Sequence, residues 1–217
     1  MRAVKLRGLA VGVSLLAATA PTTAYADVVT FNFESFPIQS GLNSLALSGG
    51  GLTATLLGTN FALVDLSSLV PFGVPPSWGS RTLSPFDQPT SDPFTLNFSQ
   101  GISGLSVEMG DFTIDEDALT LQLFSGLNGT GTLLGSSSST LLADNNFRFT
   151  VLTLSVNAMP ALSARFIGTN SGVQSVYYDN ITATFGATPT AVPEPGTLAL
   201  MASGLFGIGL IRRRKRK

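Results

Sequence analysis

The chemistry open to this chain is limited first by the residue types that it lacks. Its 217 residues include no His and no Cys. This excludes Ser-His and Cys-His nucleophiles, imidazole or thiolate zinc sites, and disulfide bonds. Any enzymatic reaction would therefore have to use carboxylates, hydroxyl groups or Arg side chains.

The acidic residues offer little pattern for catalysis. Their densest cluster, Asp111 to Asp117, lacks the Gly and the Glu that an EF-hand loop needs at its sixth and twelfth positions. Glycoside hydrolysis needs two carboxylates roughly 5 to 10 Å apart in a cleft, and no spacing here marks such a pair. We therefore expect no enzymatic activity, and we expect this cluster to be a solvated loop.

Basic residues are concentrated at the two ends of the chain, and acidic residues in its centre. Between the ends lie only three cations, Arg81, Arg148 and Arg165, against twelve acids from Asp27 to Asp179. The central region therefore carries a net charge of about −9. A region this acidic should repel phosphate backbones, which argues against nucleic-acid binding.

The first 26 residues have the organisation of a secretory signal peptide. A basic start precedes the apolar stretch from Gly8 to Ala20, and the small-residue site Ala24-Tyr25-Ala26 follows. About 13 apolar residues are too few to span a membrane comfortably. We therefore expect export, with cleavage before Asp27.

A second apolar stretch, Gly196 to Ile211, lies near the C-terminus. Sixteen residues of helix are about 24 Å long, somewhat less than the roughly 30 Å of a bilayer's hydrocarbon. We expect a minimal single transmembrane helix over 196–211. The bulk of the chain should lie outside, because Lys and Arg stay on the cytoplasmic side. The basic tail that stops the helix, 212–217, consists of Arg212, Arg213, Arg214, Lys215, Arg216 and Lys217.

A rigid triplet, Pro193-Glu194-Pro195, stands directly before that helix, at the end of a linker over 187–195. Two prolines fix φ and exclude helix, so Glu194 should be presented on an extended segment at the membrane face. The triplet, the apolar helix and the basic tail, in this order from Val192 to Lys217, resemble the PEP-CTERM sorting signal of Gram-negative bacteria.

This resemblance implies recognition and processing by exosortase, a cysteine transpeptidase-like enzyme of the inner membrane. It also implies transfer to the cell surface or the extracellular matrix, in bacteria that usually make exopolysaccharide. The same tail is known as the C-terminal segment of some ice-binding proteins. The alternative is an ordinary tail anchor behind a Pro-rich linker.

The region 27–186 should be an all-β domain, an antiparallel β-sandwich of jelly-roll type. Short alternating runs recur between Gly, Ser, Asn and Asp residues, without sustained helical periodicity. A parity change in 147–156 predicts a bulge or bend near Val151, and the Pro-rich stretch 58–93 should form loops. The nine predicted strands cover 28–33, 52–57, 94–98, 104–109, 118–124, 131–134, 147–156, 163–168 and 176–185.

The first and last predicted strands carry a second resemblance. The segments 30–34 and 177–181 resemble the first and last strands of jelly-roll carbohydrate-binding modules and related surface domains. In that group a Glu after the first strand and an Asp in the last often help to bind a structural calcium. The resemblance therefore implies a calcium role for Glu34 and Asp179.

The strand pattern gives Asp179 a separate reason to need a partner. It shares the parity of Tyr177, Ile181 and Phe185, so its carboxylate should point to the apolar side. A carboxylate there requires a cation or several hydrogen-bond donors. Calcium, Arg148 or a strand-end position open to water would each satisfy it.

Aromatic residues in the Pro-rich stretch are candidates for sugar binding. Sugars are recognised by aromatic faces together with planar polar groups, and Phe72, Trp78 and Phe86 lie in this stretch. The alternative is that they plug one end of the sandwich.

We therefore expect an exported, non-catalytic surface or matrix protein associated with polysaccharide. A secreted glycan hydrolase and an adhesin or ice-binding surface are the alternatives. The run Ser136 to Thr140 is too irregular for the flat Thr array of an ice binder.

Overall fold

Alternating apolar and polar residues build the strands of the central domain. The structure, a computed structural model, describes residues 26–85, 93–111, 116–142, 150–169 and 176–186. All of them belong to the unit Tyr25–Thr188. The strands within these residues are β1 (Asp27–Phe31), β2 (Gln39–Gly49), β3 (Leu52–Asp65), β4 (Arg81–Ser84), β5 (Phe94–Asp111), β6 (Asp117–Phe124), β7 (Leu133–Leu141), β8 (Thr150–Thr169) and β9 (Tyr177–Phe185). Three short 3₁₀ helices accompany them, η1 (Val70–Phe72), η2 (Pro76–Trp78) and η3 (Leu127–Gly129).

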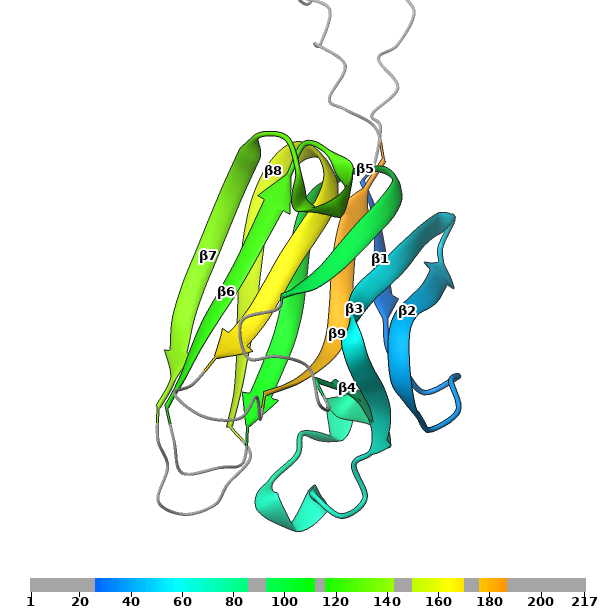
Figure 1. The fold of residues 1–217 in the computed structure, drawn as a ribbon, viewed down its shortest axis with the longest axis vertical. Coiled ribbons are helices and arrows are strands. Elements are labelled where there is room, and N and C mark those ends of the chain that lie inside the picture. Colours follow the sequence, from blue (N-terminus) through cyan, green and yellow to red (C-terminus); the bar gives the residue numbers. More distant parts are fainter. Residues whose placement is uncertain (1–25, 86–92, 112–115, 143–149, 170–175, 187–217) are drawn as a thin grey trace, which may run out of the picture. The chain divides into compact units, whose positions relative to one another are not determined.

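Two long strands, β5 and β8, take part in both layers of the sandwich (Figure 1). Their halves 94–98 and 163–166 pair within the order β2-β3-β5-β8-β6-β7, which we call the first layer. The other half of β5, 104–111, pairs with β8 residues 150–157 on one side and with β9 on the other. β9 in turn pairs with β1, and this is the second layer. All these pairings are antiparallel. The all-β prediction is therefore confirmed.

Close contacts hold the two layers face to face. A Cβ on Gly49 of β2 would lie 2.7 Å from Val29 of β1, and one on Gly135 of β7 would lie 2.6 Å from Val156 of β8. Since real Cβ contacts are essentially never this short, the lack of a side chain at both glycines lets the two layers lie this close. Each pair joins a strand of the first layer to a strand of the second.

The core between the layers is centred on a group of aromatic rings. Phe94 stacks on Phe166 at 5.4 Å between centroids, and its ring also lies 5.6 Å from Phe61 and 5.2 Å from Tyr178. All four side chains have no exposed surface. The predicted alternation in β6 is confirmed, since Leu119, Leu121 and Leu123 are buried.

The sequence patterns missed two strands and divided two others. β2 and β4 were not predicted, and the segment 58–93, predicted to be loops, contains the end of β3 and all of β4. β2 has only two buried positions, Leu45 and Leu47, so its apolar pattern is weak. β5 and β8 each join two predicted strands, because the chain bends at a register shift without leaving the sheet.

The bulge predicted near Val151 lies elsewhere. β8 pairs with β5 in unbroken register from Thr150 to Asn157, and the shifts occur between Asn157 and Ser163. This is where β8 passes from one layer to the other, so the bend is set by the crossing and not by the parity change at Val151.

The predicted targeting segments lie outside the described residues. These are the signal peptide up to residue 25, the Pro-Glu-Pro triplet, the helix over 196–211 and the basic tail. Arg148 and Phe86 also lie outside them. In the part of the chain that the structure describes, no helix is long and apolar enough to cross a membrane.

Candidate functional site

Three carboxylates lie near one another, next to η2 and the start of β4. Glu108 of β5 is paired with Asp179 of β9, and Glu34 follows β1. Asn180 links them to the η2 segment, because its Nδ2 donates to Glu108 Oε2 at 3.0 Å and to the Ser77 carbonyl at 3.1 Å. We call Glu34, Glu108 and Asp179 the acidic cluster.

Glu34 is held by donors from the segment after η2. Its carboxylate accepts hydrogen bonds from the Ser80 N–H and Oγ–H, both at 2.8 Å, and from the Arg81 N–H at 2.9 Å. Gly79 adopts a φ of +65°, and a Cβ there would lie 2.4 Å from Glu34 Oε1, so only glycine fits. Burial raises the pKa of Glu34, but the bonds from Ser80 and Arg81 outweigh it, and the pKa lies below its usual value.

Asp179 is the buried member of the acidic cluster, and one of its carboxylate oxygens lacks a hydrogen-bond partner among the described residues. It is fully buried. Its Oδ1 accepts the Asn180 N–H at 2.7 Å, whereas Oδ2 has no hydrogen-bond partner among the described residues. The pKa of Asp179 is raised to about 8, first by burial and further by the charges of Glu34 and Glu108, although the hydrogen bond from Asn180 acts to lower it. The carboxyl group must therefore hold a proton or face a cation near neutral pH.

The parity argument for Asp179 is wrong in its detail. Asn180 has a φ of +45°, and the register of β9 against β5 shifts at this point. As a result Tyr178, Ile181 and Phe185 all belong to the main core, while Tyr177 packs against a second cluster of Leu66, Leu69 and Trp78. The predicted burial of Asp179 is nevertheless confirmed.

The acidic cluster fits calcium only in part. The buried and unsatisfied Oδ2 of Asp179, with two further carboxylates nearby, is a suitable ligand for a hard cation. Both oxygens of Glu34, however, already accept hydrogen bonds. Within the described residues no group of three or more such side chains has the arrangement of a metal site. Calcium binding therefore stays a prediction, with Asp179 as its better-supported ligand.

The sugar-binding hypothesis must be corrected for Trp78. Its side chain is 1% exposed and packs against Leu66 and Leu69, and its Nε1–H donates to Glu108 Oε2 at 2.6 Å. A sugar cannot stack on a covered ring, so the alternative that Trp78 plugs one end of the sandwich is the better description. Phe72 is 37% exposed, and Phe86 lies outside the described residues.

The acidic segment 111–117 is less solvated than expected. Asp111 ends β5 and Asp117 begins β6, and both are buried, whereas Glu116 is exposed. Residues 112–115 lie outside the described residues. The expectation of a solvated loop is therefore wrong for Asp111 and Asp117.

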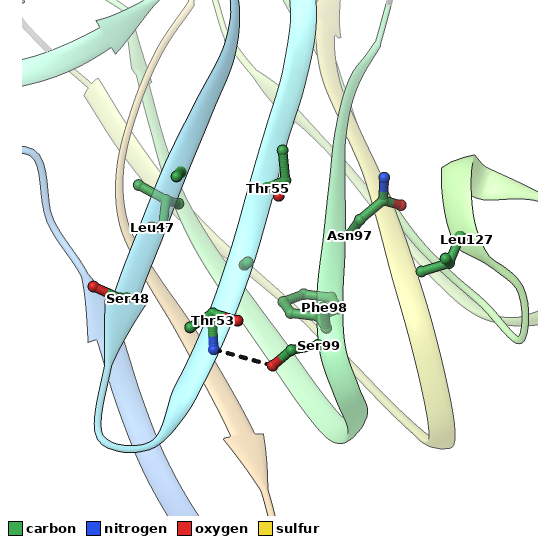
Figure 2. A pocket seen from close by; sticks show the side chains of 10 residues that line it. Leu47, Ser48, Thr53, Thr55, Asn97, Phe98, Ser99 and Leu127 are labelled. Atoms are coloured by element: carbon green, nitrogen blue, oxygen red, sulfur yellow. Dashed lines mark hydrogen bonds between the residues drawn. The ribbon is translucent and has the colours of Figure 1, made fainter.

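A groove of about 400 Å³ lies on the outer face of the first layer (Figure 2). Thr53 and Thr55 of β3 and Asn97 of β5 line it, with Ser48 of β2 beside them. Leu127 of η3 forms the opposite rim and is 49% exposed. Thr55 is paired with Asn97 in the sheet, so hydroxyl and amide groups from neighbouring strands stand side by side in the groove.

The rim of the groove is fixed to the sheet by side-chain amides. Asn97 Nδ2 donates to Asn128 Oδ1, and the Asn128 N–H donates to Asn97 Oδ1, both at 2.7 Å. Arg165 Nη2 donates to the Asn128 carbonyl at 3.0 Å, and its guanidinium lies 5.6 Å from the centre of the Phe124 ring. These contacts hold η3 against the face and preorganise the groove.

The outer face of the first layer is polar and nearly without charge. The strand registers place Thr95, Arg165, Gln122 and Ser136 in one row across β5, β8, β6 and β7. In this row across the first layer, Arg165 is the charged residue, and the other three side chains are uncharged. Sequence reasoning missed this surface because it looked for aromatic rings, and because the neighbours of Thr55 and Asn97 depend on a strand pairing that the pattern does not contain.

Fold and site together define an antiparallel β-sandwich with a polar, preformed groove and an acidic cluster around the buried Asp179. Residues 191–215 match the family described as the PEP-CTERM protein-sorting motif. The C-terminal resemblance is thus confirmed: the chain carries the signal of an exported protein that exosortase processes at the membrane of Gram-negative bacteria. No curated protein sequence matches the chain.

Several solved structures resemble the domain. The K2 cleaved adhesin domain of Lys-gingipain has a TM-score of 0.48 and 14% identity, covering 73% of this chain and 98% of its own. A family 29 carbohydrate-binding module has a TM-score of 0.34 and 12% identity, covering 80% and 100%. The Podospora anserina GH26-CBM35 β-(1,4)-mannanase has a TM-score of 0.35 and 16% identity, covering 76% and 29%. Because these scores lie below 0.5, we base the functional proposals on the chain's own residues.

Proposed function

We propose that this chain is a non-catalytic protein that exosortase delivers to the cell surface or the extracellular matrix, where its β-domain associates with polysaccharide. The observation that carries the sorting part is the order of the C-terminal elements, triplet, apolar helix and basic tail. None of these three elements has a structural role in a β-sandwich, whereas each of them has a role at a membrane.

The three elements divide the task of sorting. The helix over 196–211 holds the chain in the inner membrane, and the basic tail keeps the C-terminus in the cytoplasm. The triplet is then left at the outer face, where its two prolines keep Glu194 extended and accessible to a membrane enzyme.

Replacing Glu194 by Ala should impair processing and leave membrane insertion intact. The uncleaved form should then accumulate in the membrane fraction, which immunoblotting of fractionated cells would measure. Thr190→Ala, in the linker outside the triplet, is the matched control. If the Glu194 variant were released normally, or if deleting exosortase had no effect, the C-terminal segment would be only a membrane anchor and not a sorting signal.

The outer face of the first layer supports a polyhydroxylated ligand. Its groove offers the hydroxyl groups of Thr53 and Thr55, which pair readily with sugar hydroxyls, beside the Asn97 amide that holds the rim. Asp179 is buried, so it is poorly placed to act on a glycan as one of the two carboxylates of a hydrolase.

Polysaccharide binding should depend on the groove. Thr55→Val keeps the side-chain shape and removes one hydrogen-bonding group, so affinity should fall by roughly five- to tenfold, equivalent to about 1 kcal/mol. Binding would be measured by calorimetry, after a glycan array of neutral and uronate-containing oligosaccharides has given a ligand. Thr30→Val, at an exposed position of β1 in the other layer, is the control. An array without any binder would refute this part of the proposal and leave the sorting part standing.

We further propose that Asp179 holds a structural calcium ion. Oδ2 lacks a hydrogen-bond partner among the described residues, and Glu34 and Glu108 add negative charge nearby. A cation there would keep Asp179 ionised in a buried place and would stabilise the contact between the η2 segment and β9.

A further inference from the structure

Arg165 of β8 carries a charge that no carboxylate among the described residues neutralises. Its Nη2 donates to the Asn128 carbonyl at 3.0 Å, and its Nε is covered and has no hydrogen-bond partner in the described part of the chain. The other described cation, Arg81, differs, because its charge acts on Glu34 and Asp65 and lowers the pKa values of both. Arg165 is therefore the cation that remains available to an anion from outside.

The guanidinium of Arg165 is held in place before any ligand binds. It lies 5.6 Å from the centre of the Phe124 ring, and the Asn128 carbonyl fixes Nη2. The backbone of η3 lies directly against it, because a Cβ on Gly129 would collide with the guanidinium. The Arg165 side chain is still partly exposed. An anion can thus reach it, and little side-chain entropy is lost on binding.

Arg165 lies beside the groove and among side chains that suit a sugar. The strand registers place Thr95 of β5 and Gln122 of β6 opposite Arg165, and both are partly exposed. Their hydroxyl and amide groups can bond to sugar hydroxyls. Thr95 is two residues from Asn97 of the groove, about 7 Å along β5. A chain of sugars that occupies the groove can therefore extend to Arg165.

The acids that give the domain its negative charge lie away from Arg165. The described strands of the first layer contain two acids, Asp65 and Asp117. Asp117 is five residues from Gln122 along β6, about 17 Å, and Asp65 is eight residues beyond Leu57, the β3 neighbour of Thr95. Salt screens exposed charges beyond about 8–10 Å. The sign of the potential close to Arg165 is therefore set by Arg165 itself.

We propose that the polysaccharide bound by the first layer is acidic, and that Arg165 binds the carboxylate of one of its uronate units. This inference rests on the proposed polysaccharide binding and adds the chemical class of the ligand. A carboxylate matches the planar guanidinium and forms charge-assisted hydrogen bonds with it. A neutral sugar would leave the charge of Arg165 unpaired, so Arg165 determines specificity.

Matched pairs of oligosaccharides test this specificity. The full chain, purified in detergent, would be applied to an array of glucuronate-, galacturonate- and mannuronate-containing oligosaccharides, each beside its carboxyl-reduced counterpart of the same linkage. For the pairs that bind, calorimetry would give both affinities. The acidic member should bind roughly tenfold more tightly than the reduced one, and raising the salt should narrow this ratio.

Variants of Arg165 show whether the ratio depends on its charge. Arg165→Gln should bring the two affinities together, and Arg165→Lys should keep part of the ratio, because Lys retains the charge without the planar fork. A loosened η3 would weaken both members of a pair alike, so the ratio separates charge from structural damage. Asp65→Asn, which changes the net charge by one at an exposed position, is the control and should keep the wild-type ratio.

The outcomes separate this inference from the proposed function. Equal wild-type affinities for the acidic and reduced members, or an unchanged ratio in Arg165→Gln, would overturn the role of Arg165 and leave polysaccharide binding standing. Thr55→Val, in the groove, should weaken both members of a pair by a similar factor. If no oligosaccharide of either kind bound, the proposed polysaccharide binding would be rejected together with the inference that rests on it.

Discussion

Raising the pH from about 5 to 8 should progressively destabilise the calcium-free domain, and Asp179 should be responsible. Burial raises the pKa of Asp179 to about 8 in the folded protein, whereas in the unfolded chain it should lie near its ordinary value of about 3.9. Between these values the folded state binds a proton that the unfolded state does not. Unfolding is therefore favoured as the pH rises, by about 1.4 kcal/mol for each pH unit.

The direction of its pKa shift distinguishes Asp179 from Glu34 and Asp65. Glu34 and Asp65 have lowered pKa values, so they favour the folded state above their unfolded pKa and lose that effect as the pH falls. Their contributions change below about pH 5, whereas that of Asp179 changes between about pH 5 and 8. Urea denaturation at several pH values would measure the slope.

Asp179→Asn should remove this pH dependence, because an amide cannot ionise. The matched control is Asp65→Asn, which replaces an exposed acid that accepts a hydrogen bond from the Ser67 N–H and should keep the wild-type slope. A flat wild-type profile between pH 5 and 8, or an equal slope in Asp179→Asn, would show that Asp179 does not retain its proton.

Calcium should have its largest effect under the same conditions. A cation bound to the ionised carboxylate replaces the proton, so the pH slope should flatten in calcium. At about 100 times its dissociation constant, calcium would add about 2.7 kcal/mol if it binds only the folded state. Equal unfolding curves in calcium and in chelator at pH 8 would show that the domain binds no calcium. Asp179 would then be buried in its neutral, protonated form.

The sequence predicted the fold class because the strands that form the core alternate clearly. β6 and β9 were placed almost to the residue, since their apolar positions repeat every second residue. β2 was not predicted, because an edge strand with two buried side chains has no such repeat. The sequence also did not predict that 94–98 and 104–109 form one strand, β5, since a bend at a layer crossing resembles a turn in sequence.

The sequence could predict only those features of the candidate site that depend on the position of a single residue in its own strand. The burial of Asp179 could be read from its strand. The contact of Trp78 with Glu108 spans 30 residues and depends on how the η2 segment folds back on β5. The groove could not be read at all, because Thr55 and Asn97 become neighbours only through the pairing of β3 with β5.

The second large effect is expected in the aromatic core. Phe94 begins β5 in the first layer and touches Phe61 and Phe166 there, as well as Tyr178 of the second layer. Phe94→Ala would remove a ring from the point where the layers meet and leave a cavity. We expect a loss of about 3–5 kcal/mol, a large part of the 5–15 kcal/mol that typically holds a domain folded.

Exposure determines how large this effect should be. Phe72→Ala makes the same chemical change at a side chain that is 37% exposed, and it should cost less than about 1 kcal/mol. Phe94→Leu should fall between the two, because it refills most of the cavity but loses the ring contacts. Urea denaturation midpoints of the three variants would be compared with wild type. Equal losses for Phe94→Ala and Phe72→Ala would mean that Phe94 does not join the layers as this packing requires.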